Sequence, residues 1–197
     1  MYFELIIVLL KITFANLIYL KNKRRINNYY SEIKLVIEIS DYISPGHVKE
    51  AYILNDRFSP EPFEVKVNGN TKPNCKKTCY FQKGINYVTL KFEDHIKTCE
   101  SMFSDVEGII EVDLSEFDAS RVVNMSYMFA DCSDLKKINF GNVNISSVEN
   151  MKGLFYGCSS LTSIDLSNID TSNIKALDGM FFECSSIEKI DFGNINI

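Results

Sequence analysis

The sequence contains no tryptophan and only two histidines, His47 and His95. Neither histidine accompanies a serine or cysteine in a recognised nucleophile motif, so the usual arrangements for covalent catalysis are missing. No segment approaches the G-x-x-x-x-G-K-S/T pattern of phosphate-binding loops. We therefore expect no catalytic residues and no bound cofactor or metal ion, and we predict that the protein is not an enzyme.

An excess of positive charge is also lacking. The formal net charge is −5, and lysine and arginine cluster only between Lys21 and Arg25. Proteins that bind nucleic acid usually carry a basic patch that neutralises phosphates. The composition therefore argues against a nucleic-acid partner.

The longest apolar run occupies residues 3–20, interrupted by Glu4 and Lys11. It fits a secretory signal peptide cut after Ala15, although no basic residue precedes it. A membrane anchor formed by residues 3–20 is the alternative, and the Lys21–Arg25 cluster would then hold the rest of the chain in the cytoplasm. An amphipathic or buried helix is a third interpretation.

The second half of the chain repeats itself every 26 residues. An apolar-Phe pair recurs without gaps as Met102-Phe103, Met128-Phe129, Leu154-Phe155 and Met180-Phe181. A cysteine recurs at the same step as Cys132, Cys158 and Cys184. Because missing a repeat misassigns the whole fold, this period governs the interpretation of the chain.

Each repeat unit contains two apolar spacings. Segments such as Val112-Asp113-Leu114 alternate apolar and polar residues and predict a short strand. Further along, Val122, Met125, Phe129 and Cys132 lie three or four residues apart, which predicts one face of a short helix. The sequence thus predicts an α/β repeat, a right-handed solenoid of strand-plus-helix units.

The segment before the repeats predicts strands of its own. Residues 33–39, 63–67 and 87–92 alternate apolar and polar positions, and Asn68-Gly69 is a tight-turn signal. We divide the chain into a leader and linker (1–30), a small β-rich capping domain (31–95) and the repeats (96–197). The repeats stop at Ile197 without a capping sequence, so we expect a fragment of a longer repeat protein or an end that pairs with another molecule.

The string from Leu161 to Ser172, followed by Met180-Phe181 and Cys184-Ser185-Ser186, resembles the BspA-type leucine-rich repeat. The resemblance covers residues of about 96–197. It implies a leucine-rich-repeat solenoid, an extracellular setting, and adhesion or binding to host components. It names no ligand.

One polar column stands out as a candidate ligand-facing surface. A polar residue occupies the central, outward-facing position of each predicted strand; the four are Asp113, Asn139, Asp165 and Asp191. A solvated polar face is the simpler interpretation, and a protein, glycan or divalent-ion contact is the functional one. A second candidate is the aromatic set Tyr127, Tyr156 and Phe182.

The cysteines fall into two groups. The repeat cysteines have core spacing, which predicts buried free thiols. Cys75 and Cys79 lie in a loop, where a disulfide between them, or from one of them to Cys99, fits a secreted protein. A zinc site would need Cys99 and His95 as further ligands. In a secreted eukaryotic chain, Asn124 and Asn144 would also be candidate glycosylation sites.

The leading functional hypothesis is therefore a secreted or cell-surface protein that mediates adhesion or recognition. Its partner would be a protein or glycan on another cell or host surface. The alternative is an intracellular scaffold, anchored in the membrane through residues 3–20, with its repeats in the cytosol.

Overall fold

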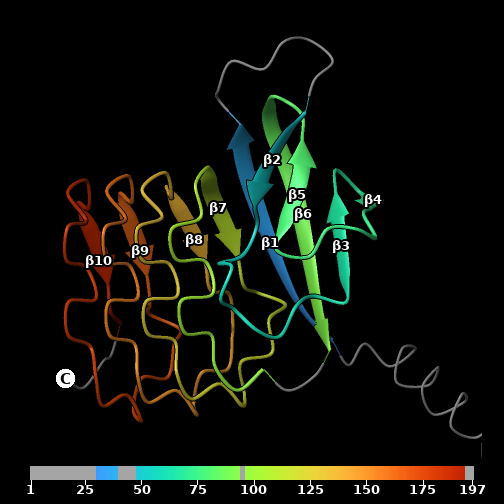
Figure 1. Cartoon of the computed structure of the whole chain (residues 1–197). Coiled ribbons are helices and arrows are strands. Elements are labelled where there is room, and N and C mark those ends of the chain that lie inside the picture. Colours follow the sequence, from blue (N-terminus) through green and yellow to red (C-terminus); the bar gives the residue numbers. More distant parts are fainter. Residues whose placement is uncertain (1–29, 40–47, 94–95, 194–197) are drawn as a thin grey trace, which may run out of the picture. The chain divides into compact units, whose positions relative to one another are not determined.

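The computed structural model describes residues 30–39, 48–93 and 96–193 (Figure 1). Residues 1–29 of the predicted leader and linker, and both histidines, lie outside these ranges. The described residues from Ser31 onward belong to one compact unit, and the architecture below is that of this unit. Within the described ranges, no helix is long and apolar enough to cross a membrane.

A six-stranded mixed sheet runs from the first described residues into the repeats. Its order is β4-β3-β6-β1-β7-β8. The strands are β1 (Tyr30–Ile39), β3 (Glu64–Val67), β4 (Asn70–Thr71), β6 (Gly84–Glu93), β7 (Ile109–Asp113) and β8 (Lys137–Asn139). One sheet therefore bridges the sequence boundary drawn near residue 95.

The period-2 pattern explains why these segments form strands. In β1, Ile33, Leu35, Ile37 and Ile39 are buried, whereas Lys34 and Glu38 between them are exposed. Since successive side chains of a strand point to opposite faces, β1 has one apolar face and one polar face. The same alternation in β6 buries Val88, Leu90 and Phe92.

Two shorter elements complete the N-terminal part. Asn68 and Gly69, both with positive φ, close the hairpin between β3 and β4 at the predicted turn. Strands β2 (Lys49–Tyr52) and β5 (Thr78–Phe81) pair as a separate antiparallel ribbon, which the sequence pattern did not predict.

The repeats stack as successive coils of chain (Figure 1). β7 pairs in parallel with β8, and β9 (Ser163–Asp165) pairs in parallel with β10 (Lys189–Asp191). The register joins Asp113 to Asn139 and Asp165 to Asp191, so each residue pairs with its equivalent in the next unit.

The predicted helices are wrong: the described residues contain strands and turns but no helix. The cause is visible in the second unit, where Tyr127 has φ 56° and Asp131 has φ 58°. A right-handed helix cannot continue through such left-handed residues. The equivalent positions of the next unit are Gly153 and Gly157, also with positive φ. The predicted α/β leucine-rich-repeat solenoid is thereby corrected to a strand-rich fold with mixed sheets.

Hydrogen bonds between coils replace the helical ones. The amides of Met125, Tyr127, Phe129 and Asp131 donate to carbonyls of the next coil, at 2.7–3.0 Å. The amides between them, of Met128 and Ala130, close tight turns onto Met125 and Tyr127. Every second amide thus ties one coil to its neighbour, as in a parallel ladder. The apolar spacing of three and four comes from these consecutive turns.

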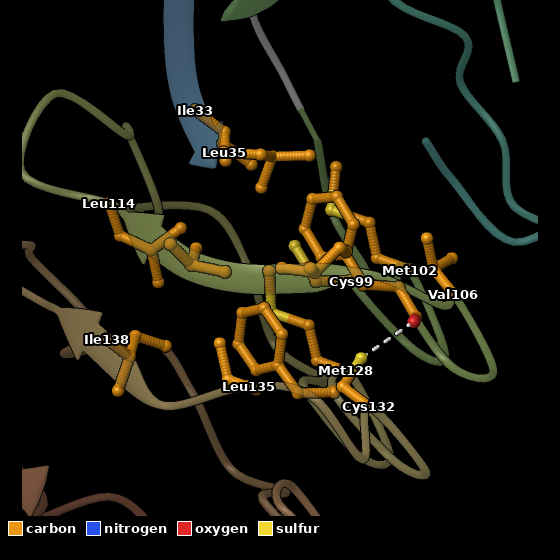
Figure 2. Packing of buried hydrophobic residues seen from close by; sticks show 14 of the residues in the cluster. Ile33, Leu35, Cys99, Met102, Val106, Leu114, Met128, Cys132, Leu135 and Ile138 are labelled. Atoms are coloured by element: carbon orange, nitrogen blue, oxygen red, sulfur yellow. Dashed lines mark hydrogen bonds between the residues drawn. The ribbon is translucent and has the colours of Figure 1, made fainter. Parts of the chain in front are cut away.

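The interior of the stack consists of aligned columns of equivalent side chains. Phe103, Phe129, Phe155 and Phe181 stack with ring centroids 5.4–5.7 Å apart and planes within 8° of parallel. Figure 2 shows how Ile33 and Leu35 of β1 meet the coil side chains Met102 and Leu114 in one core. β1 covers the first coil by antiparallel pairing with β7, for example Lys34 opposite Asp113.

Candidate recognition surface

The predicted polar column lies at the ends of β7–β10, where its side chains close turns. In each unit the Oδ1 atom accepts a hydrogen bond from the backbone N–H two residues later. The donors are Ser115, Gly141, Ser167 and Gly193, at 2.9–3.0 Å. Such Asx turns are a local reason for Asp or Asn at these positions. The structure therefore gives the column of Asp113, Asn139, Asp165 and Asp191 a structural role in addition to any role in binding.

The electrostatics of this column begin at Asp113. Burial opposes ionisation of Asp113, but hydrogen bonds from Ser115, the positive charge of Lys34 and the Asn139 amide together lower its pKa. The Asn139 Nδ2 group donates to Asp113 Oδ1 at 3.1 Å. Asp113 is therefore held as a carboxylate with fixed orientation at the end of β7.

Asp113 and Asn139 line a shallow hollow on the outer face of the sheet. The hollow has a volume of about 280 Å³ and extends across β6, β1, β7 and β8. Its lining also includes Lys34, Lys137 and Tyr87. The Tyr87 side chain is 64% exposed. We call this feature the sheet-face hollow; it joins carboxylate, amide and ammonium groups to one exposed aromatic ring.

Tyr87 was not recognised as a candidate in the sequence. It is one of the outward residues of a predicted strand, and nothing local distinguishes it from Tyr80, which is 59% exposed on the β2–β5 ribbon. Only the long-range order β6-β1-β7-β8 brings Tyr87 to the polar column. Asp165 and Asp191 do not line this hollow, because its lining ends at β8 and these two residues lie on β9 and β10.

The aromatic set does not form one continuous column. Tyr156 and Phe182 stack with centroids 5.3 Å apart, and Phe182 is 56% exposed. Tyr127 instead lies against Gly153, where an added Cβ would be 2.4 Å from Tyr127 Cε1. Tyr127 therefore packs the second coil against the third, and Tyr156 with Phe182 packs the third coil against the fourth.

The repeat cysteines are buried thiols that bond between coils. The Sγ atoms of Cys132, Cys158 and Cys184 donate to carbonyls of the preceding coil at 3.0–3.1 Å (Figure 2 shows the first). Burial raises the pKa of Cys132 to about 12 and also raises the pKa of Cys99. A nucleophilic cysteine needs an accessible thiolate. These groups therefore hold the core together and are poor nucleophiles.

Cys75 and Cys79 are joined by a disulfide. Cys99 is a free thiol in the buried core, so it takes no part in this disulfide. Within the described ranges, no group of three or more His, Cys, Asp or Glu side chains is placed to hold a metal ion.

The two candidate glycosylation residues differ in their surroundings. Asn124 Nδ2 donates to Glu100 Oε2 at 3.1 Å, and Ser126 of the same motif is only 3% exposed. Asn144 is exposed, and its Oδ1 accepts from both the amide and the hydroxyl of Ser146. Of the two, Asn144 has the more accessible amide.

One family model matches more than half of the chain. It is described as "Mycoplasma protein of unknown function, DUF285", and it covers residues 81–196. The chain belongs to this family. No curated protein and no solved structure matches it.

The match to the DUF285 family shows that the assignment to the BspA-type leucine-rich repeats, suggested by the sequence resemblance, was wrong. The residues that suggested it have general structural uses in this fold. Asp165 accepts from Ser167 in an Asx turn, and Cys184 bonds to a carbonyl of the preceding coil. Residue types chosen for turns and for a stacked core do not by themselves distinguish one repeat family from another.

Proposed function

We propose that this DUF285 chain is a non-catalytic recognition protein that acts outside the cell and binds a protein or glycan. The observation that carries the proposal is the sheet-face hollow, where Tyr87 lies with Asp113, Asn139 and two lysines. Tyrosine is enriched at binding surfaces because it combines a large rigid ring with a hydrogen-bonding group. A few oriented polar groups beside it provide specificity.

The extracellular setting is supported by the cysteines. A disulfide between Cys75 and Cys79 suits an oxidising compartment. The remaining described cysteines are buried, so they survive oxidising conditions without exposed thiols. The absence of a nucleophile motif in the sequence supports binding over catalysis.

Location can be measured on intact source cells. A membrane-impermeant amine label should modify exposed lysines of the repeats, such as Lys137 and Lys175, before the cells are lysed. A cytosolic protein of the same cells is the control and should stay unlabelled. Labelling of the repeats only after lysis, together with an uncleaved N-terminus, would establish the membrane-anchored scaffold instead.

The role of the hollow can be tested with two matched tyrosines. Fluorescently labelled full-length protein is applied to a printed glycan array and to intact eukaryotic cells. Tyr87→Ala should weaken binding at least about ten-fold, as expected for a central aromatic contact. Tyr80→Ala removes an equally exposed ring outside the hollow and should change binding less than about two-fold. Equal effects of the two substitutions would reject the hollow as the binding surface.

A further inference from the structure

In each later coil, a row of backbone carbonyls accepts hydrogen bonds from the coil before it. The first coil carries the equivalent row of carbonyls. Between the first and second coils, four amides donate to four carbonyls: Cys99 to Asn124, Ser101 to Ser126, Phe103 to Met128 and Asp105 to Ala130, at 2.8–3.0 Å. One repeat earlier, the equivalent carbonyls belong to Thr98, Glu100, Met102 and Ser104. Among the described residues no repeat coil precedes them, so donors for these carbonyls must come from other elements.

Asn55 supplies half of the missing donors. Its backbone amide donates to the Met102 carbonyl at 2.9 Å, and its Nδ2 group donates to the Ser104 carbonyl at 3.0 Å. The Asn55 Oδ1 atom accepts from Arg57 N–H at 3.0 Å, which fixes the side chain. A single asparagine thus replaces two amides of a neighbouring coil.

The other half of the row has no donor among the described residues. The carbonyls of Thr98 and Glu100 accept no hydrogen bond there. Both residues line a groove of about 700 Å³, together with Ser101 and Asp105 from the coil and residues 55–59 from the opposite side. This volume lies within the roughly 300–1,000 Å³ of typical ligand sites. We call it the first-coil groove.

The charge of the first-coil groove is negative. Asp56, Glu100 and Asp105 line it, against the single guanidinium of Arg57. A second hollow shares Tyr52 and Asp105 with this groove. Its lining contains four further carboxylates and two lysines. Burial and the charge of Asp105 raise the pKa of the neighbouring Asp131, so carboxylates are crowded here. Such a site favours a cationic ligand.

We propose that the first-coil groove binds an extended polypeptide segment that carries a lysine or arginine. Two alternate backbone N–H groups of the segment donate to the carbonyls of Thr98 and Glu100, as the amides of Cys99 and Ser101 do one coil later. The cationic side chain lies against Asp105 and Glu100. Tyr52, which is 50% exposed, offers its ring to the same cation or to an apolar neighbour.

This site is separate from the sheet-face hollow, with which it shares no lining residue. The two binding activities can therefore be lost independently, and Tyr87→Ala should leave peptide binding unchanged. Such a result also separates failure of this proposal from failure of the proposed function.

The test uses the full-length protein and a fluorescein-labelled, capped hexapeptide of alternating lysine and valine, followed by anisotropy. One version of the peptide is N-methylated at every lysine and another at every valine. A strand-like ligand presents only one set of alternate amides, so one version should lose at least about ten-fold in affinity and the other should retain binding. A glutamate-valine hexapeptide should not bind.

Variants locate the site. Asp105→Asn should weaken binding of the lysine-valine peptide by about three- to ten-fold, and Asn tolerates the positive φ of this position. Glu188→Gln removes an exposed carboxylate that lines neither hollow and is the matched control. Equal binding of both N-methylated peptides, no binding of the parent peptide, or no effect of Asp105→Asn would each overturn the proposal.

Discussion

Replacing Phe129 by alanine is expected to lower the free energy of unfolding by about 3–5 kcal/mol. Phe129 is fully buried and stacks on Phe103 at 5.4 Å and on Phe155 at 5.6 Å. Truncation therefore leaves a cavity and removes two aromatic contacts, each worth about 0.5–1.5 kcal/mol beyond the buried area. Chemical denaturation followed by circular dichroism measures the loss.

Phe182→Ala is the matched control for Phe129→Ala. Phe182 belongs to the same set of coils but lies outside the phenylalanine column; it is 56% exposed and its ring stacks on Tyr156. Its truncation should cost less than about 1 kcal/mol, because solvent already reaches the ring. Equal losses for the two variants would show that the column of phenylalanines does not form the core of the stack.

The sequence pattern predicted the register of this column but not the backbone that carries it. A step of 26 residues aligns equivalent side chains whatever the local conformation, and the strands β7–β10 fall at the alternating segments. The spacing of Val122, Met125 and Phe129 also fits a helix, and periodicity alone cannot tell a helix from consecutive tight turns.

A signal against helices was present in the glycines. Gly153, Gly157 and Gly179 occupy the two left-handed positions of the third and fourth units. Glycine at fixed positions of a repeat indicates positive φ. In the second unit, Tyr127 and Asp131 hold the same conformation, and these residue types gave no such indication.

The candidate site could be predicted only in part, for a different reason. The polar column from Asp113 to Asp191 could be recognised in the sequence because each of its residues belongs to a local strand pattern. Tyr87 and Asn55 were missed because their roles depend on partners far away in the chain: Tyr87 meets the column through β1, and Asn55 bonds to Ser104. Long-range pairing of this kind leaves no local pattern.

The junction between the N-terminal strands and the repeats depends on Gly108, and Gly108→Ala should destabilise the protein by about 3 kcal/mol. Gly108 has φ +77°, and an added Cβ would lie 2.7 Å from the Glu38 carbonyl oxygen. That carbonyl cannot easily withdraw, because the Glu38 amide donates to the Gly108 carbonyl at 2.8 Å. Relief of the clash requires β1 to move away from the first coil. Chemical denaturation measures the change.

Gly69→Ala separates the clash from the backbone strain. Gly69 has φ +79°, nearly the same as Gly108, but an added Cβ would meet no atom within 4 Å. Its substitution should cost only the left-handed conformation, about 1–2 kcal/mol. The difference between the two losses in free energy of unfolding measures how tightly β1 is held against the first coil. If Gly108→Ala costs no more than Gly69→Ala, β1 yields readily, and the N-terminal strands are not a rigid cover for the repeats.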